Sequence, residues 1–342
     1  MSYPIPLTRG RRLDLRVHAD ADTRLRAPRR AFQITLGVLW LLDAALQFQP
    51  YMFTPAFVHH IIAPTAQGNP GWISSSETWA ASLMVAHVTV YDAVFGTVQL
   101  LLAIAILFRP TVKIGLAASI PWAIGVWWFG EGLGGVFTGA SPLTAAPGAV
   151  ILYALIAVLV WPRASERDGV SVAAGGPLGR HLPRVAWLLL WGSATYFLLL
   201  APNRAPGSYH DVFAGMAGGE PGWLAGIDAH LAGYLAGAGG GVSIVLAACC
   251  ALVAVSVFVP ALTRPGLVVA VLLGLAIWLA QNFGGILTGQ GTDPNSGLLL
   301  VFLALVYWPL SGAATEPGLA GGGAAPSYRE RRLREPAAHQ AG

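Results

Sequence analysis

Residues 127–139 read WWFGEGLGGVFTG, and residues 278–289 return to much of the same pattern as WLAQNFGGILTG. In both places an apolar run breaks into a Gly-Gly-x-[Phe/Leu]-Thr-Gly stretch. An offset of 150 residues aligns Gly134 with Gly284. The match predicts a chain that arose by internal duplication.

Each glycine-rich stretch is followed by only a short apolar segment, residues 147–161 in the first copy and 296–308 in the second. Paired short, glycine-interrupted hydrophobic segments in two halves are a pointer to the binding site of a repeat-built membrane protein. The alternative is that the glycines only let helices approach one another closely. Both interpretations remain open at the level of the sequence.

A second internal match joins the motif Gly-x-Pro-Gly-Trp at residues 68–72 to the same motif at 219–223, with an offset of 151 residues. Gly and Pro favour a tight turn, and Trp suits the headgroup boundary of a membrane. A structural anchor therefore explains this motif without any chemistry.

The composition places the chain among membrane proteins. Hydrophobic residues make up 55% of it and charged residues only 11%, against about 25% charged residues in a soluble domain. We therefore expect the lipid bilayer to be the principal partner. The formal net charge of +4 does not indicate nucleic acid, because the basic residues lie in tails and loops that flank apolar spans.

The apolar runs predict an all-α, polytopic membrane bundle of about eight transmembrane helices, arranged as two parallel four-helix repeats. The predicted spans are residues 31–48, 82–108, 111–129, 147–161, 185–200, 231–259, 266–279 and 296–308. The predicted organisation is an Arg-rich cytoplasmic tail (1–30), a first repeat (31–162), a cytoplasmic linker (163–184), a second repeat (185–309) and a disordered cytoplasmic tail (310–342).

The distribution of basic residues supports this topology. Of the 20 Lys and Arg residues, only Arg204 falls on the side opposite to the others. Such asymmetry predicts a multi-pass protein of the cell (inner) membrane with both termini in the cytoplasm. The glycine-rich stretches then lie towards the outer face.

Polar residues accompany the glycine-rich stretches. Glu131 aligns with Gln281, and the second copy adds Asn282 and Asp293. Backbone that is not helical at membrane depth is tolerated only where it lines a protein cavity, so we expect these four residues to bind a ligand. The N-terminal ends of the short spans that follow would favour an anion or a carbonyl oxygen.

Two more candidates come from the apolar spans. Asp43 and Asp92 are carboxylates in hydrocarbon-like segments, where such groups normally face a bundle interior, a partner or water. Neither has a carboxylate counterpart in the other half, so any function is predicted to be asymmetric. Asp92 and the nearby His87, close to the outer end of a span, are predicted to support the ligand site.

His59 and His210 occupy matching positions in the two long outer loops, at an offset of 151 residues. Neutral imidazole is a common metal ligand, and together with His60 and Asp211 the pair would suit zinc, copper or iron. We therefore predict a possible metal site at His59 and His210. Simple solvation of histidines at the interface is the alternative.

The order of elements in each half is a span, an amphipathic outer loop, a long span that ends in a small apolar run and Arg-Pro (96–110 here), and two closely spaced spans. This layout resembles the DoxX/DoxD-like four-helix membrane proteins, as a fused tandem pair. Some members of that family are associated with quinone-linked sulfur oxidation or with thiol and oxidative stress. The resemblance implies a membrane redox partner and a quinone.

The leading hypothesis is an integral membrane protein with an outward-facing pocket between two repeats, which binds a small-molecule ligand, a metal ion or a quinone in a redox or stress-response system. One alternative is a transporter for a small solute. Another is an assembly subunit of the membrane without chemistry. Whether the protein is an enzyme is left open by the sequence.

Overall fold

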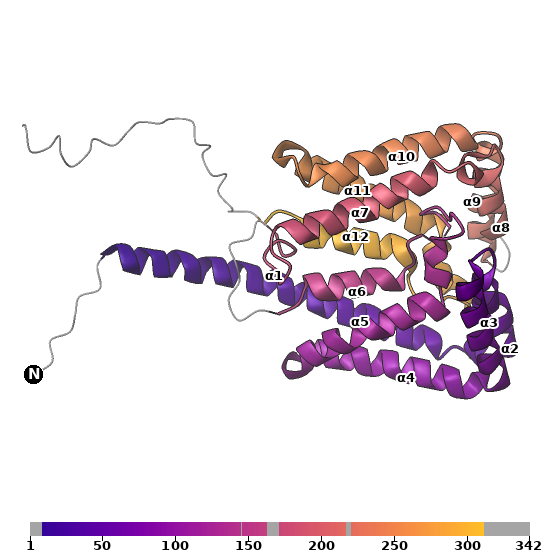
Figure 1. Cartoon of the computed structure of the whole chain (residues 1–342), viewed down its shortest axis with the longest axis horizontal. Coiled ribbons are helices and arrows are strands. Elements are labelled where there is room, and N and C mark those ends of the chain that lie inside the picture. The colour runs from indigo at the N-terminus through magenta and orange to yellow at the C-terminus, as the bar shows by residue number, and fades with distance from the viewer. Residues whose placement is uncertain (1–8, 145, 163–170, 217–219, 311–342) are drawn as a thin grey trace, which may run out of the picture. The chain divides into compact units, whose positions relative to one another are not determined.

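The computed structural model describes residues 9–144, 146–162, 171–216 and 220–310, with side chains from residue 27 onward. Within these ranges the chain forms helices joined by turns, and no strand occurs among them (Figure 1). The all-α prediction is confirmed for this part of the chain. The predicted C-terminal tail and residues 163–170 of the predicted linker lie outside the described residues.

The first part of the chain contains six α-helices and the second part contains six more within the described residues. The first six are α1 (Arg9–Gln47), α2 (Pro55–Phe57), α3 (Gly71–Ala86), α4 (Val88–Leu107), α5 (Val112–Phe129) and α6 (Val150–Leu159). The others are α7 (His181–Leu198), α8 (Ser208–Met216), α9 (Gly222–Leu235), α10 (Gly239–Ser256), α11 (Pro260–Ala280) and α12 (Asn295–Tyr307). Short helical turns include η2 (Val58–Ile62), η5 (Gly132–Gly135) and η7 (Asn282–Thr288).

Four helical segments of the described chain are long and apolar enough to cross a membrane. They are Val88–Leu107, Arg109–Phe129, Gly239–Ser256 and Pro260–Thr288. These segments also expose large apolar side chains, among them Leu101 on α4 and Leu272 on α11, each 60% exposed. Such surfaces suit lipid acyl chains, so the fold is consistent with a membrane protein. The count of eight spans remains a prediction.

The structure corrects two predicted spans. Residues 82–108 do not form one helix, because the chain leaves the helical conformation at His87 (φ −143°, ψ 41°), between α3 and α4. Residues 231–259 are likewise divided between α9 and α10, with Gly237 at φ +83°. In Figure 1, α3 and α9 run across one end of the bundle, so the chain has to turn before each long helix begins.

The structure also differs from the prediction in the N-terminal tail and in the linker. Helix α1 already begins at Arg9 and continues through residue 30, where the sequence predicts the end of a tail. The predicted linker is not wholly solvated, since Val172 and Ala173 are each only 1% exposed and the amide of Ala173 donates to the carbonyl of Val306 at 3.1 Å. Burial of small apolar side chains therefore anchors the described part of the linker to the bundle.

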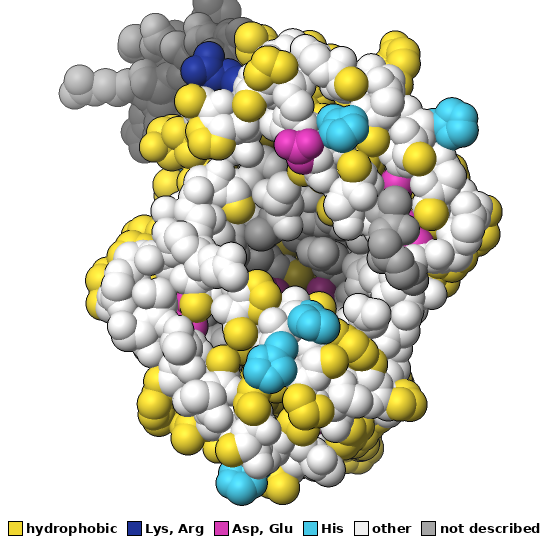
Figure 2. All heavy atoms as spheres, turned by 90° about the vertical axis from the view of Figure 1, so that its right-hand side faces the viewer, with side chains coloured by type: hydrophobic (Ala, Val, Ile, Leu, Met, Phe, Trp, Pro, Cys, Tyr) yellow, Lys and Arg dark blue, Asp and Glu magenta, His cyan; other side chains and the backbone are white. Residues whose placement is uncertain are grey.

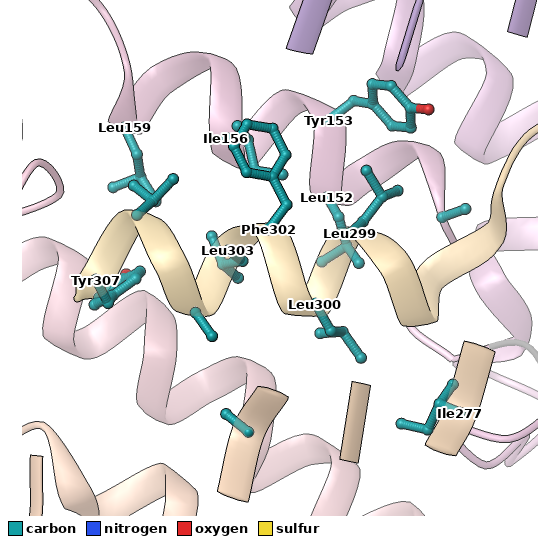
Figure 3. Packing of buried hydrophobic residues seen from close by; sticks show 14 of the residues in the cluster. Leu152, Tyr153, Ile156, Leu159, Ile277, Leu299, Leu300, Phe302, Leu303 and Tyr307 are labelled. Carbon is teal, nitrogen blue, oxygen red and sulfur yellow. The ribbon is translucent and has the colours of Figure 1, made fainter. Parts of the chain in front are cut away.

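The centre of the bundle is formed by two short apolar helices. Helix α6 has 10 residues and α12 has 13, which corresponds to lengths of about 15 and 20 Å, short of a hydrocarbon core of about 30 Å. Figure 3 shows their buried side chains packed against one another. Leu159, Leu299 and Leu303 are fully buried in this contact.

The C-terminal end of α6 is held by α1. The guanidinium of Arg29 donates to the carbonyl oxygens of Leu159 at 2.9 Å and of Val172 at 3.2 Å. The amide of Gln33 donates to the carbonyl of Val160 at 2.9 Å. The last carbonyls of a helix lack partners within it and carry partial negative charge, so a buried cation is favourable there.

We expect Arg29→Met to lower the free energy of unfolding by about 2–4 kcal/mol, because it leaves buried carbonyl groups without donors. Thermal unfolding in detergent measures this loss. The matched control is Arg264→Met on α11, where the arginine is exposed. Equal unfolding temperatures for the two variants would contradict the assigned role of Arg29.

Candidate functional site

Both glycine-rich stretches bend the backbone into a conformation that favours glycine. Gly134 has φ +63°, and a Cβ atom there would lie 2.1 Å from the carbonyl oxygen of Pro147. Gly284 has φ +76°, and its Cβ would lie 2.3 Å from the carbonyl oxygen of Asp293. No side chain can be accommodated at either position, because the two backbone segments lie too close together. Each stretch therefore packs directly against the residues that lead into a central short helix.

This packing brings a side chain to the N-terminal end of each short helix. The Oε1 atom of Glu131 accepts hydrogen bonds from the amides of Ala149 and Val150, both at 3.1 Å, at the start of α6. The Oε1 atom of Gln281 accepts from the amide of Gly297 at 3.4 Å, at the start of α12. Free amides at a helix N-terminus attract negative charge.

The anion or carbonyl oxygen expected at these helix ends is supplied by the protein itself. The carboxylate of Glu131 and the amide oxygen of Gln281 already accept from the first free amides of the two short helices. An incoming anion would have to displace the protein's own acceptors. The donors that we expected to hold a ligand instead orient Glu131.

A cavity of about 300 Å³ opens beside Glu131. Figure 2 looks onto the end of the bundle that carries α3 and α9 and shows a hollow there, with acidic side chains in its depth. All lining residues except Thr292 and Asp293 come from residues 40–153. The lining comprises Trp40, Asp43, Gln47, Phe57, Ile61, Ile62, Met84, Phe95, Gln99, Pro121, Trp122, Gly125, Val126, Phe129, Gly130, Glu131, Val150, Tyr153, Thr292 and Asp293.

Three carboxyl groups from distant parts of the chain line this cavity. Asp43 comes from α1, Glu131 follows α5, and Asp293 precedes α12. The hydroxyl of Tyr153 donates to Asp43 at 3.0 Å, and Asp293 accepts from the hydroxyl of Thr292 at 3.0 Å. Among the described residues, no Lys, Arg or His lies in the lining, so this part of the chain supplies no positive charge to the wall of the cavity.

Burial, and then the negative charge of Asp293, raise the pKa of Glu131 to about 8. Burial also raises the pKa of Asp293. The two amides that donate to Glu131 oppose this shift, but desolvation outweighs them. A neutral carboxyl group is therefore favoured at Glu131 near neutral pH, and a positive charge nearby would favour ionisation.

The rest of the wall is aromatic and carries polar atoms without partners. The indole nitrogens of Trp40 and Trp122 and the Oε1 atom of Gln99 are buried and make no hydrogen bond. All three residues line the cavity. Since buried polar atoms nearly always have a partner, the wall is suited to a bound molecule or water that completes these bonds.

The remaining predicted ligand residues do not line the cavity. Asp92 is fully buried behind its wall and accepts a hydrogen bond from Gln47, which does line it. Gln281 follows the last residue of α11 and its side chain contacts the start of α12. Asn282 donates to the carboxyl groups of two other residues outside the cavity. His87 is exposed at the break between α3 and α4.

The predicted metal residues lie on the surface. His59 and His60 are exposed on η2, and His210 is exposed on α8, where its Nδ1 atom lies 3.0 Å from Oδ1 of Asp211. In the described part of the chain, no group of three or more His, Cys, Asp or Glu residues is arranged to hold a metal ion. A metal site at His59 and His210 thus stays a prediction that the geometry does not support.

The ligand residues predicted from sequence omit several that the structure brings together. Asp43 is recognisable in the sequence as a carboxylate in a span, whereas no sequence pattern distinguishes Trp40, Trp122 and Tyr153 from other aromatic residues of apolar spans. Glu77 was also overlooked. A signal existed for it, because Asp228 follows it by 151 residues, the same offset that joins the two Gly-x-Pro-Gly-Trp motifs.

No family model, curated protein or solved structure matches the chain. The fold and the site define its class: a helical protein that has, within its described residues, four helices long and apolar enough to cross a membrane and an acidic, aromatic cavity at one end of the bundle. The resemblance to DoxX/DoxD-like proteins remains a prediction.

Proposed function

We propose that the chain crosses the cell membrane eight times as two parallel four-helix repeats, with both termini in the cytoplasm. The matched backbone conformations of Gly134 and Gly284 and the matched hydrogen bonds of Glu131 and Gln281 support the duplication. The distribution of basic residues supports the orientation. In this arrangement the cavity opens to the outer face.

The function that fits the cavity best is binding of a small organic cation, such as an ammonium compound, from the outer side of the membrane. The observation that carries this proposal is the convergence of Asp43, Glu131 and Asp293 on one cavity without a basic residue in its lining. Ionised carboxylates in such a site need a positive charge to offset desolvation. The ligand would supply it.

The aromatic wall supports the same class of ligand. Trp40, Trp122 and Tyr153 line the cavity together with three phenylalanines. A cation that lies against the face of an aromatic ring gains about 0.5–2 kcal/mol, most when it is desolvated. Pockets that recognise quaternary ammonium groups combine such rings with a carboxylate, and this cavity contains both.

A matched pair of probes tests the proposal. Choline and its neutral isostere 3,3-dimethyl-1-butanol have nearly the same shape and differ in charge. We expect choline to change the tryptophan fluorescence of the purified protein at a concentration at least about 10-fold lower, because a charge difference worth about 1.4 kcal/mol gives that factor. Equal affinity for the two probes would overturn the cation proposal.

The affinity for an organic cation is expected to rise with pH between about 6 and 9, as Glu131 with its pKa of about 8 ionises. Stability of the unliganded protein should change in the opposite direction. The unfolded state releases the proton of Glu131 at the ordinary pKa of 4.5 and the folded state only at about 8, so stability falls as pH rises from about 4.5 to about 8. Titrations of binding and of unfolding temperature against pH measure both trends, and a pH-independent affinity would contradict the role of Glu131.

A second candidate is a quinone, which the resemblance also implies. It is favoured by the unpartnered indole donors of Trp40 and Trp122, because these can donate to carbonyl oxygens but not to a cation. A short-chain quinone should then quench tryptophan fluorescence with an affinity that does not rise with pH. Binding of a quinone would imply that the protein has a redox partner in the membrane.

A further inference from the structure

A second cluster of buried oxygen atoms lies outside the cavity, where α9 meets the second glycine-rich stretch. It consists of Glu220, just before α9, Asp228, within α9, and Asn282, at the start of η7. Asp228 is 2% exposed and Asn282 is 4% exposed. The three side chains come from two parts of the chain, residues 220–228 and the second glycine-rich stretch, and converge on one point.

The contacts within this cluster leave acceptors without donors. The Nδ2 atom of Asn282 donates to Oδ2 of Asp228 at 3.0 Å and also to Oε1 of Glu220. The Oδ1 atom of Asn282 and the Oε2 atom of Glu220 are buried and have no partner. One side-chain amide thus serves two carboxyl groups, and buried oxygen atoms remain unsatisfied, which is costly.

Among the described side chains, no positive charge compensates these two carboxyl groups. Neither Glu220 nor Asp228 forms an ion pair with Lys or Arg in the described part of the chain. The two carboxyl groups instead interact with each other, and burial raises the pKa of both. In the absence of a cation, a shared proton is the remaining way to reduce their repulsion.

We infer that Glu220, Asp228 and Asn282 form a binding site for one calcium ion. Two carboxylates and an amide provide up to five oxygen ligands, the type that Ca²⁺ prefers, and Ca²⁺ tolerates irregular arrangements that water or backbone carbonyls complete. The oxygen and nitrogen of an Asn side chain are interchangeable by a half-turn. With this half-turn, Oδ1 of Asn282 faces the ion and gains a partner.

The first half of the chain supplies a natural comparison. Asn69 and Glu77 lie 151 residues before Glu220 and Asp228. There the amide of Asn69 donates to Glu77 at 3.3 Å and to the carbonyl of Thr65 at 3.0 Å. An amide replaces the second carboxylate, so this place holds one negative charge rather than two and lacks the charge for a divalent ion.

The site has a consequence for the cavity. Asn282 begins the stretch in which Gly284 packs against the backbone of Asp293, and Asp293 lines the cavity. A calcium ion would tie α9 to this stretch and so restrain the segment that positions one cavity carboxylate. The inference does not depend on which ligand the cavity takes.

The test is calcium binding to the purified full-length protein after treatment with chelator. We expect equilibrium dialysis with radioactive Ca²⁺ to find one ion per chain. One millimolar CaCl₂ should raise the midpoint of thermal unfolding by about 5 °C, as expected for a ligand at many times its dissociation constant. The same concentration of Mg²⁺ should have a smaller effect, because Mg²⁺ requires near-octahedral geometry.

Glu220→Gln and Asp228→Asn should each abolish the calcium effect, whereas the matched control Glu77→Gln should retain it. Glu131→Gln should also retain it, which separates this site from the proposed cation cavity. Absence of bound Ca²⁺ in the wild type, or an unchanged calcium effect in Glu220→Gln, would overturn the inference. Stability that responds to pH but not to Ca²⁺ would show that the cluster holds a shared proton only.

Discussion

Replacement of Gly134 by alanine is expected to prevent the protein from folding to its native state. The added Cβ would lie 2.1 Å from the carbonyl oxygen of Pro147. A Cβ atom does not approach a non-bonded oxygen this closely. The positive φ at this position adds backbone strain for any L-residue. We expect a loss of more than about 4 kcal/mol, in the range of the most severe single substitutions.

Size-exclusion chromatography of the fluorescently tagged protein and thermal unfolding measure this effect. Gly284→Ala should behave in the same way, because its Cβ would meet the carbonyl of Asp293 at 2.3 Å. The control is Gly192→Ala in α7, where nothing lies within 4 Å of the added atom and alanine favours the helix by up to about 1 kcal/mol. A native-like Gly134→Ala protein would refute the close approach.

Glu131→Gln is expected to separate the two roles of this residue. A glutamine oxygen can still accept from the amides of Ala149 and Val150, as Gln281 does from Gly297. The fold should therefore persist. Without the carboxylate, affinity for an organic cation should fall by about 10- to 100-fold, the equivalent of about 1.4–2.8 kcal/mol, and lose its dependence on pH.

Glu131→Leu should remove both functions, because leucine offers no acceptor to the start of α6. We expect it to lower the unfolding temperature as well as to abolish cation binding, since loss of an N-cap costs about 0.5–2 kcal/mol. Glu77→Gln, a change of a buried carboxyl group outside the cavity, serves as the control and should bind cations like the wild type. Wild-type affinity in Glu131→Gln would exclude this carboxylate from the site.

The glycine-rich stretches illustrate what local sequence can predict. A Gly-Gly pair that interrupts an apolar run indicates unusual backbone, and positive φ at Gly134 and Gly284 confirms this. Close helix packing and a binding site are the two interpretations of these glycines. In the structure, close packing of Gly134 accompanies the placement of Glu131 beside the cavity.

The helix breaks illustrate what local sequence could not predict. Residues 82–108 and 231–259 are predominantly apolar, so hydropathy alone joins α3 to α4 and α9 to α10. The breaks at His87 and Gly237 depend on how α3 and α9 pack across the end of the bundle. Of the two breaks, only the one at position 237 has a signal in the sequence. The residue there is a glycine, which adopts the positive φ of this break without strain.

The sequence by itself determined the class of the fold. A high apolar content, long hydrophobic runs and few charges predict helices that suit a bilayer, because each helix satisfies its own backbone hydrogen bonds without help from distant residues. The carboxylates in or next to these runs could also be recognised as costly. Their partners could not, since Asp43, Glu131 and Asp293 are far apart along the chain.

Only the tertiary structure decided which of these residues share a site. Packing of α1, α5, α6 and the segment before α12 brings three carboxyl groups to one cavity, while Asn282, its neighbour Gln281 and the predicted metal residues lie elsewhere. The physical reason is that an ionisable side chain takes its chemistry from what surrounds it in space. Burial and the charge of Asp293 raise the pKa of Glu131, and neither can be read from the neighbouring sequence.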